Sequence, residues 1–473
     1  MALQYEELRS VAEEHGQGHI FQWWEELDDA EAEGLLAQVA EIDFDLLDRL
    51  IEEHVRNPQE VRLGELEPAQ PIPLPCTEEE REARRRAVAK GQEALRAGRV
   101  AALVVAGGQG TRLGYDGPKG TFPAGPVTGK PLFQLHAEKI RAASRRYGVR
   151  IPWYIMTSEA NDAATRSFFD EHRCFGLDGD DVVFFRQGTM PAVDLEGKLL
   201  MAGKGRIATS PNGHGGTLAA LRDTGALDDL RRRGIDVISY SQVDNPLIRI
   251  IDPAFIGHHL DSGSEFSSKS LPKRDAEEGL GVFCYVDGQL RVVEYSDLPE
   301  ECKYATEPDG SLRFSAGNIA IHILAPDLVE RLTEEGASLP YHRALKKVPH
   351  VDAQGRSLEP DEPNGVKFEM FIFDALPHAT NPLVMTVRRE EEFAPIKRAE
   401  GEDSPHTARQ AQVDLFGRWL EQAGVAVPRD QEGNVAGSVE ISPLVARDAE
   451  ELRQRLPQGT AFRDGLYLGP EAG

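Results

Sequence analysis

The 473-residue chain is poor in cysteine and lysine and has no long apolar run. Its four cysteines lie far apart and form no Cys-x-x-Cys pair, which argues against a disulfide framework and against a zinc knuckle. No stretch approaches the roughly 20 consecutive apolar residues that a membrane span requires. The first ten residues lack the basic and apolar regions of a secretory signal. We therefore expect a soluble, cytoplasmic protein with reduced thiols.

The chain also has fewer positive than negative side chains. Its 53 lysines and arginines face 79 aspartates and glutamates, which gives a formal net charge of −26. So acidic a protein repels nucleic acid and anionic membranes, and we expect neither as a partner. A small phosphate-bearing ligand would need local cations and backbone N–H groups to oppose this field. Only 13 of the 53 basic residues are lysine, so a lysine inside a glycine-rich motif is informative.

Apolar periodicity predicts three segments of different character. Residues 1–98 form a helical N-terminal region, with leucines at three- and four-residue spacing between 35 and 50 that we interpret as a packing surface. Residues 99–388 form a central domain. Residues 389–473 lack the alternating strand and helix patterns of the central domain, and we expect them to form a small C-terminal domain.

Strand and helix patterns alternate within the central domain. The continuous apolar run 100–106 predicts a strand buried on both faces, with further strands at 151–157, 182–186 and 236–243. Helical patterns lie at 132–147 and 217–233, and hairpin signals at Asp287-Gly288 and Asp309-Gly310. This alternation predicts an α/β fold with a doubly wound, Rossmann-like sheet.

A glycine-rich loop follows the first predicted strand of this sheet. Residues 106–114 read AGGQGTRLG, and Pro118-Lys119 follow shortly after. Glycines let the backbone approach phosphates closely and direct several N–H groups at them. Arg112 and Lys119 lie seven residues apart around this loop, which favours a phosphate cradle over a plain strand-to-helix connection.

Two commoner phosphate loops are excluded by spacing. A dinucleotide fingerprint needs a third glycine where Leu113 stands, so an NAD-dependent oxidoreductase is disfavoured. A Walker A loop needs four residues between its glycine and its Gly-Lys-Ser/Thr, whereas Gly125 and Gly129 are separated by three. The cradle of 107–114 with Lys119 suits nucleotidyl transfer, in which every reacting group is anionic.

At these residues the chain resembles the UDP-sugar pyrophosphorylase family, and most closely its UDP-N-acetylhexosamine (UDP-N-acetylglucosamine) branch. The resemblance covers most of residues 17–412 and includes several motifs in one order. These are GQGHIFQWWEEL, VVAGGQGTRLGYDGPKG, RQGTMPA, SPNGHGGTLAAL, QVDNPL, VVEYSDL, AGNIAIH, NGVKFEMFIFD and EEFAPIKRAEG. It implies a nucleotidyltransferase sheet, UTP and a sugar 1-phosphate as partners, and Mg²⁺ as cofactor.

The resemblance also implies roles for individual residues. Arg112, Lys119 and Lys397 would be catalytic cations, and Asp244 would bind substrate and hold the metal. The remaining substrate-binding positions would be Val105, Ala106, Gly107, Gly108, Gln187, Gly213, His214, Gly281, Glu294, Tyr295, Asn318 and Lys367. The position of Asp244 also indicates ligand binding independently of the resemblance, because it follows an apolar strand at the end where ligands of open α/β sheets bind.

His214 departs from the acetylhexosamine branch, which usually carries asparagine there. The resulting Gly-His-Gly resembles the UDP-glucose and broad-specificity branches. We therefore expect a UTP:sugar-1-phosphate uridylyltransferase most suited to N-acetylglucosamine 1-phosphate, with a UDP-glucose or broad-specificity enzyme as the alternative. A UDP-sugar sensor without catalytic activity is a third reading. The sequence leaves the oligomeric state open.

Overall fold

The computed structural model describes residues 2–58, 63–334 and 338–470. It contains two compact units, each discontinuous in sequence. The smaller unit comprises Met1–Leu63, Gln187–Leu218 and Ser338–Asp374, and the larger comprises Gly64–Arg186, Ala219–Ala337 and Ala375–Gly473. The division into sequence segments 1–98, 99–388 and 389–473 stays a prediction.

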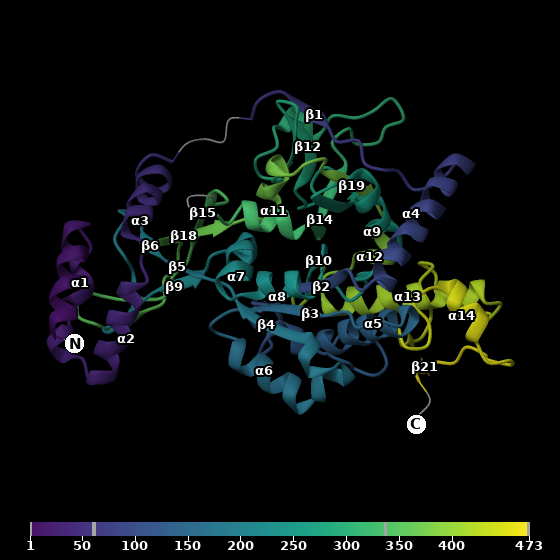
Figure 1. Cartoon of the computed structure of the whole chain (residues 1–473), viewed down its shortest axis with the longest axis horizontal. Helices are drawn as coiled ribbons and strands as arrows, with labels where there is room; N and C mark the ends of the chain where they lie inside the picture. The colour runs from purple at the N-terminus through teal and green to yellow at the C-terminus, as the bar shows by residue number, and fades with distance from the viewer. Residues whose placement is uncertain (1, 59–62, 335–337, 471–473) are drawn as a thin grey trace. The chain divides into compact units, whose positions relative to one another are not determined.

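A mixed sheet forms the core of the larger unit (Figure 1). Its main path runs β1-β12-β14-β10-β2-β3-β4, and β10, β2, β3 and β4 are parallel. The strands on this path are β1 (Leu66–Pro68), β2 (Val100–Val105), β3 (Trp153–Thr157), β4 (Val182–Arg186), β10 (Val237–Gln242), β12 (Val282–Val286) and β14 (Ala316–Leu324). The sheet is completed by β11 (Phe266–Pro272), β13 (Gln289–Val293) and β19 (Leu383–Thr386). The α/β fold and the four parallel strands expected from the apolar runs are confirmed.

Helices cover this sheet and supply much of its core. In the larger unit these helices include α4 (Glu78–Arg96), α5 (Leu132–Tyr147), α6 (Asp162–Glu171), α8 (Ala226–Arg232), α9 (Pro253–Ser262), α10 (Glu300–Lys303), α11 (Pro326–Arg331) and α12 (Arg389–Glu392). Phe133 of α5 and Phe169 of α6 pack edge to face, with ring centroids 4.9 Å apart. Glycine permits the close approach of α4 to α9, since a Cβ on Gly91 would lie 1.9 Å from the carbonyl oxygen of Pro253.

The helical pattern expected over 217–233 is interrupted. It forms α7 (Thr217–Asp223) and then α8, and Gly225 between them has φ of +74°. A left-handed residue cannot continue an α-helix, which explains the break. The Asp287-Gly288 turn does connect β12 and β13, as its sequence predicts.

The smaller unit packs helices against short strands. Its helices are α1 (Ala2–Glu14), α2 (Asp29–Ala40) and α3 (Phe44–Ile51), and its three-stranded sheet has the order β15 (Tyr341–Lys346), β18 (Gly365–Met370) and β6 (Val193–Asp194). Strand pairs are formed by β5 (Thr189–Pro191) with β9 (Thr209–Pro211), β7 (Met201–Gly203) with β8 (Arg206–Ile207), and β16 (His350–Val351) with β17 (Ser357–Leu358). Leu35, Leu36 and Val39 are buried in this unit's core, as the packing-surface interpretation predicts.

The last part of the chain belongs to the larger unit. It contains α13 (Pro405–Gln422), β20 (Val439–Ile441), α14 (Ala449–Arg455) and β21 (Leu466–Leu468), drawn in yellow at the right of Figure 1. β20 and β21 pair in parallel, and Val439 and Leu466 pack with Trp419 of α13. Over the described residues, no helix combines the length and apolarity needed to cross a membrane.

Candidate active site

The glycine-rich loop leaves the end of β2 and is held by two polar side chains that follow β3. Oγ of Ser158 donates to the carbonyl oxygen of Gly107 (2.8 Å), and Nδ2 of Asn161 donates to those of Ala106 (2.8 Å) and Gly108 (3.3 Å). The N–H groups of Gly107 and Gly108 have no acceptor in the described part of the chain. With its carbonyls held and these donors available, the loop is suited to bind an anion.

Lys119 and Asp244 form an ion pair at the carboxyl ends of two adjacent strands. Val105 ends β2 and pairs in register with Gln242 of β10, so the loops after both strands lie together. Nζ of Lys119 lies 2.9 Å from Oδ2 of Asp244. Burial alone would raise the pKa of Asp244, but the ammonium groups of Lys119 and Lys397 outweigh it and hold the pKa below its ordinary value.

A cavity of about 230 Å³ lies beside this ion pair in the larger unit. Five of the residues expected at the site line it: Asp244, Gly281, Glu294, Asn318 and Lys397. They come from the ends of β10, β12 and β13, from β14 and from the loop after α12. The structure therefore brings together residues spread over 154 positions of sequence into one polar cavity.

Close packing and backbone strain shape the wall of this cavity. A Cβ on Gly281 would lie 3.0 Å from Oε1 of Glu294 and 2.8 Å from Cγ1 of Val292, so only glycine fits there without displacing its neighbours. Oδ1 of Asn318 accepts from the N–H of Ala320 (2.9 Å), and Ala320 has φ of +55°. A left-handed non-glycine residue is strained, and such strain concentrates at functional sites.

The two remaining expected positions of this unit are exposed. Arg112 lies on the short helix η4 (Thr111–Leu113) and makes no hydrogen bond or ion pair with any described residue. Tyr295 is 51% exposed and does not line the cavity. Lys397 is held on the cavity wall, with Nζ 3.7 Å from Oδ2 of Asp403 and 5.7 Å from the ring centre of Phe393.

Gly213 and His214 form a compact turn in the smaller unit. Gly213 has φ of +86°, and a Cβ on it would lie 2.4 Å from the carbonyl oxygen of Met370. Nδ1 of His214 accepts from the N–H of Ile372 (3.2 Å), which leaves Nε2–H as the donor of the neutral ring. Burial lowers the pKa of His214 to about 4, and its ring stacks on Phe371 at 5.4 Å.

Gln187 and Lys367 also belong to the smaller unit. Gln187 is buried just before β5, and Lys367 lies on β18 opposite Ala344 of β15. Burial lowers the pKa of Lys367 below the ordinary lysine value. A partly desolvated ammonium gains from an anionic partner.

Several supporting residues were missed by the sequence reasoning. Oδ1 of Asn245 accepts from the N–H groups of Leu247 and Ala394 (both 3.2 Å), which ties the loop after β10 to the loop that carries Lys397. Oε2 of Glu440 accepts from the N–H groups of Val127 (3.0 Å) and Thr128 (2.8 Å). No sequence motif distinguishes these side chains, because each acts on a backbone that is distant along the chain.

Comparisons with known proteins agree with this arrangement. The family model described as UTP–glucose-1-phosphate uridylyltransferase matches residues 50–403. A human relative named UDP-N-acetylhexosamine pyrophosphorylase-like protein 1 is 38% identical, with 98% of this chain and 97% of the relative covered. The UDP-N-acetylglucosamine pyrophosphorylase of Saccharomyces cerevisiae is 37% identical, with coverage of 96% and 98%.

Solved structures give the same result. The uridine diphosphate N-acetylglucosamine pyrophosphorylase of Trypanosoma brucei, solved in complex with an inhibitor, aligns with a TM-score of 0.82 at 29% identity and covers 98% of each chain. A UDP-glucose pyrophosphorylase from Leishmania major aligns with a TM-score of 0.58 at 15% identity, which shows a shared fold. The family match and the near-complete coverage by relatives above 30% identity lead to one conclusion: this chain belongs to the UTP–glucose-1-phosphate uridylyltransferase family, a family of nucleotidyltransferase enzymes.

Proposed function

We propose that this protein transfers the uridylyl group of UTP to N-acetylglucosamine 1-phosphate, forming a UDP-sugar and pyrophosphate. The observation that supports this most directly is the Lys119–Asp244 pair, which lies between a loop with free backbone donors and a cavity of sugar size. The named relatives of human and yeast origin point to the same sugar. We include a soluble, cytoplasmic location in this proposal.

The reaction needs no covalent enzyme intermediate. An oxygen of the sugar 1-phosphate attacks the α-phosphorus of UTP, a new P–O bond forms, and the bond to the bridging oxygen breaks so that pyrophosphate leaves with the electron pair. The phosphate nucleophile is already ionised near neutral pH, and no general base is required. Catalysis then depends on alignment and on neutralising negative charge.

Each cation has a distinct place in this scheme. Lys119 and the exposed Arg112 would contact the triphosphate at the glycine-rich loop. Lys397, on the wall of the cavity, would orient the phosphate of the sugar. Gly281, Glu294 and Asn318 would contact the sugar in the cavity, and we propose that Gln187, Gly213, His214 and Lys367 bind the uridine and phosphate parts of the ligand.

Enzymes that form nucleotide sugars generally use a divalent metal, and Asp244 fits Mg²⁺. No group of three or more histidine, cysteine, aspartate or glutamate side chains suited to a metal lies within residues 2–58, 63–334 and 338–470. Mg²⁺ commonly uses one or two carboxylates together with substrate phosphates and water, so a single aspartate meets its needs. When bound, the ion would neutralise charge on the reacting phosphates. Triphosphate oxygens would compete for Lys119 and so make the carboxylate of Asp244 available.

A substrate panel tests the proposal and its alternative. Pyrophosphate release is measured with UTP and either N-acetylglucosamine 1-phosphate or glucose 1-phosphate. We expect a higher kcat/KM for the acetylated sugar. A preference for glucose 1-phosphate, or equal rates, would instead support the UDP-glucose or broad-specificity reading that His214 suggests. Binding of UDP-sugars without pyrophosphate release from either substrate would support the sensor.

A further inference from the structure

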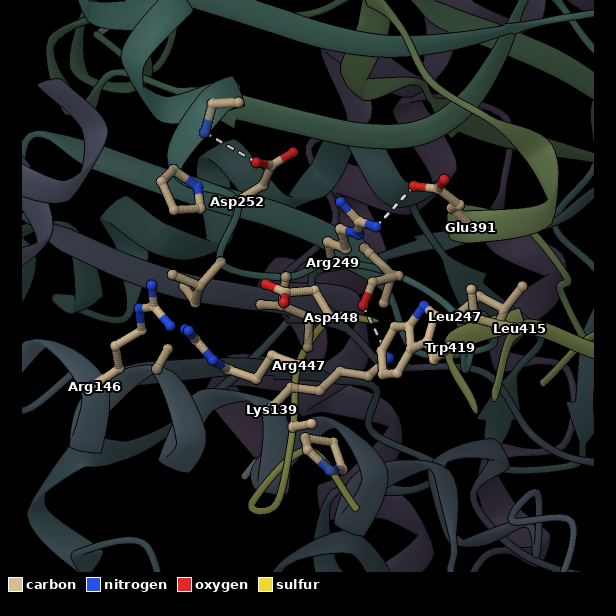
Figure 2. A pocket seen from close by; sticks show the side chains of 18 of the residues that line it. Lys139, Arg146, Leu247, Arg249, Asp252, Glu391, Leu415, Trp419, Arg447 and Asp448 are labelled. Carbon is tan, nitrogen blue, oxygen red and sulfur yellow. Dashed lines mark hydrogen bonds and ion pairs between the residues drawn. The ribbon is translucent and has the colours of Figure 1, made fainter. Parts of the chain in front are cut away.

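A second cavity lies in the larger unit, on the other side of the loop that follows β10. It has a volume of about 290 Å³ and is enclosed by α4, α5, α13, the residues after β10 and the residues after β20 (Figure 2). Its lining shares no catalytic or substrate-binding position with the candidate active site. The proposed reaction therefore leaves this cavity without a role.

Cations outnumber carboxylates in the cavity wall. Five basic side chains line it (Arg84, Lys139, Arg146, Arg249 and Arg447), against three acidic ones (Asp252, Glu391 and Asp448). All three carboxylates have partners already. Asp252 pairs with Lys269 at 2.8 Å, Glu391 pairs with Arg249 at 2.7 Å, and Asp448 accepts the N–H of Glu451 at 2.8 Å. A local excess of positive charge is unusual in a protein of net charge −26.

Lys139 is a cation of the cavity wall that bonds only neutral backbone groups. Its Nζ donates to the carbonyl oxygens of Pro246 and Ile248, the second at 2.9 Å, and forms no ion pair with a described carboxylate. An ammonium has three N–H donors, so one remains without an acceptor in the described structure. Burial lowers the pKa of Lys139 to about 7, although the neighbouring carboxylate of Glu392 opposes this decrease. An anion beside Nζ would supply the missing partner.

Two guanidinium groups give another part of the cavity wall positive charge. Arg146 and Arg447 both contact the carboxylate of Glu451, at 3.7 and 3.0 Å, and Arg455 contacts it at 2.7 Å. The single negative charge of Glu451 therefore has three cationic partners and cannot neutralise all of them. Figure 2 shows Arg146 and Arg447 at one end of the cavity.

The opposite end of the cavity has apolar side chains close to the ammonium of Lys139, which donates to the carbonyls on either side of Leu247. Leu247, Leu415 and Trp419 are labelled there in Figure 2, and Phe416 also lines the wall. Leucine and aromatic side chains around a space of this size favour an apolar body, and an ammonium without a carboxylate partner favours an anionic head. Together they define an amphipathic ligand.

We propose that this cavity binds a small organic anion, a carboxylate, sulfonate or phosphate on an apolar or aromatic body, and that this ligand inhibits uridylyl transfer. The anionic head contacts the ammonium of Lys139. The apolar body packs against Leu247 and Trp419. Inhibition rests on the proposed function, whereas binding does not.

The inhibition follows from a wall that both cavities share. Ile248 lines the second cavity and also the cavity of the candidate active site. Lys139 holds the carbonyls of Pro246 and Ile248, directly after Asp244 and Asn245, and Asn245 ties this loop to the one carrying Lys397. An anion that draws Lys139 away from these carbonyls releases the loop that positions Asp244.

The probe for binding is 8-anilinonaphthalene-1-sulfonate, which joins an aromatic body to a sulfonate and fluoresces when bound. Its matched control is N-phenyl-1-naphthylamine, which has the same rings without the charge. We expect one sulfonate probe per chain, bound at least about tenfold more tightly than the neutral control because only the sulfonate meets the cations. Equal affinities of the two probes would overturn the proposal.

Three variants locate the site. Lys139→Met removes the ammonium but keeps an apolar stem, and Val88→Trp narrows the cavity from α4 while keeping the lysine at position 139. Lys90→Met is the control, because Lys90 lies on the same helix as Val88, pairs with the exposed Asp261 and does not line the cavity. We expect the first two to weaken sulfonate binding by about fivefold or more and the third to leave it unchanged. A sulfonate affinity that survives both Lys139→Met and Val88→Trp would refute the site.

Turnover gives the second readout. Saturating sulfonate probe should lower kcat of the wild-type and Lys90→Met proteins by about threefold or more, and it should have a much smaller effect on Val88→Trp. Undiminished kcat in a wild-type protein shown to bind the probe would overturn the inhibitory coupling. Simple competition with UTP, with kcat unchanged, would place the probe at the active site and overturn the whole proposal. Because fluorescence titration needs no substrate, a failed proposed function and a failed second site give different results.

Discussion

Nζ of Lys119 and Oδ2 of Asp244 lie 2.9 Å apart, although 125 residues separate them in the sequence. The contact joins the loop after β2 to the loop after β10, at the end of the parallel sheet where ligands of such folds bind. The ammonium of Lys119 helps to hold the pKa of the Asp244 carboxyl below its ordinary value in a site that is largely buried. The pair therefore contains the cation that we propose for phosphate and the carboxylate that we propose for a metal.

Lys119→Met should lower kcat by roughly 100-fold, because one preorganised charge contact to the reacting phosphates is lost. Steady-state pyrophosphate release from UTP and N-acetylglucosamine 1-phosphate provides the measurement. Lys90→Met serves as the matched control, since its ammonium is paired at the surface and should leave kcat unchanged. Full turnover by Lys119→Met would refute the assignment of this lysine to catalysis.

The same substitution should destabilise the fold at neutral pH. With Lys119 gone, burial acts on Asp244 against weaker opposition, chiefly from Lys397, and the pKa of the carboxyl rises. A lowered carboxyl pKa stabilises the folded state above the unfolded pKa, so part of this stability is lost at pH 7. We expect urea unfolding to show a loss of roughly 1–3 kcal/mol, and the Lys119→Met/Asp244→Asn double variant to recover part of it. If the stability losses of Lys119→Met and Asp244→Asn simply add up to the loss of the double variant, a direct interaction between the two side chains is contradicted.

Gly213→Ala should be far more damaging than Gly225→Ala. Both glycines have positive φ, of +86° and +74°, so each alanine incurs backbone strain of roughly 1–2 kcal/mol. A Cβ on Gly225 meets nothing within 4 Å, whereas one on Gly213 would lie 2.4 Å from the backbone oxygen of Met370. Thermal unfolding of the two variants measures the difference, and equal midpoints would show that the turn at Gly213 can shift.

His214→Asn should keep most of the activity, whereas His214→Ala should not. Asparagine can still accept the N–H of Ile372 and offer an amide donor in place of Nε2–H. Alanine leaves the Ile372 N–H without that partner, at a cost of roughly 1–3 kcal/mol if the group stays buried. The kcat/KM values with N-acetylglucosamine 1-phosphate and with glucose 1-phosphate test both effects. An unchanged ratio of the two values in His214→Asn would remove His214 from sugar selection.

Stability should fall as the pH falls from about 6.5 to 4. Burial lowers the pKa of His136 to about 3 and that of His259 to about 4, so the unfolded chain binds more protons than the folded one across this window. Unfolding free energy then drops by up to about 1.4 kcal/mol per pH unit for each histidine. His259→Gln should reduce the slope, because glutamine can still pair with Ser267 and cannot be protonated. An unaltered slope would mean that His259 does not contribute.

The sequence was most informative where one local property determines structure. The buried strands were predicted because parallel strands covered on both faces are continuously apolar, and α5 was predicted because its apolar residues repeat with helical spacing. The helix expected over 217–233 was interrupted at Gly225, where backbone conformation outweighs helical periodicity. Asp244, Gly281 and Asn318 were proposed from motifs, and their convergence on one cavity emerged only from the folded sheet. Ser158, Asn161 and Asn245 could not be predicted, since they recognise backbone groups rather than any residue type.

The carboxylate of Glu440 holds the backbone of Val127 and Thr128, more than 300 residues earlier in the chain. During synthesis the early strands of the sheet emerge long before this residue. The N–H groups of residues 127 and 128 therefore lack their carboxylate acceptor until Glu440 has been made. We expect folding around residues 127–128 to finish only after β20 has left the ribosome, because contacts so distant along the chain form late. The emerging chain is therefore most open to chaperones, and to aggregation, over that interval.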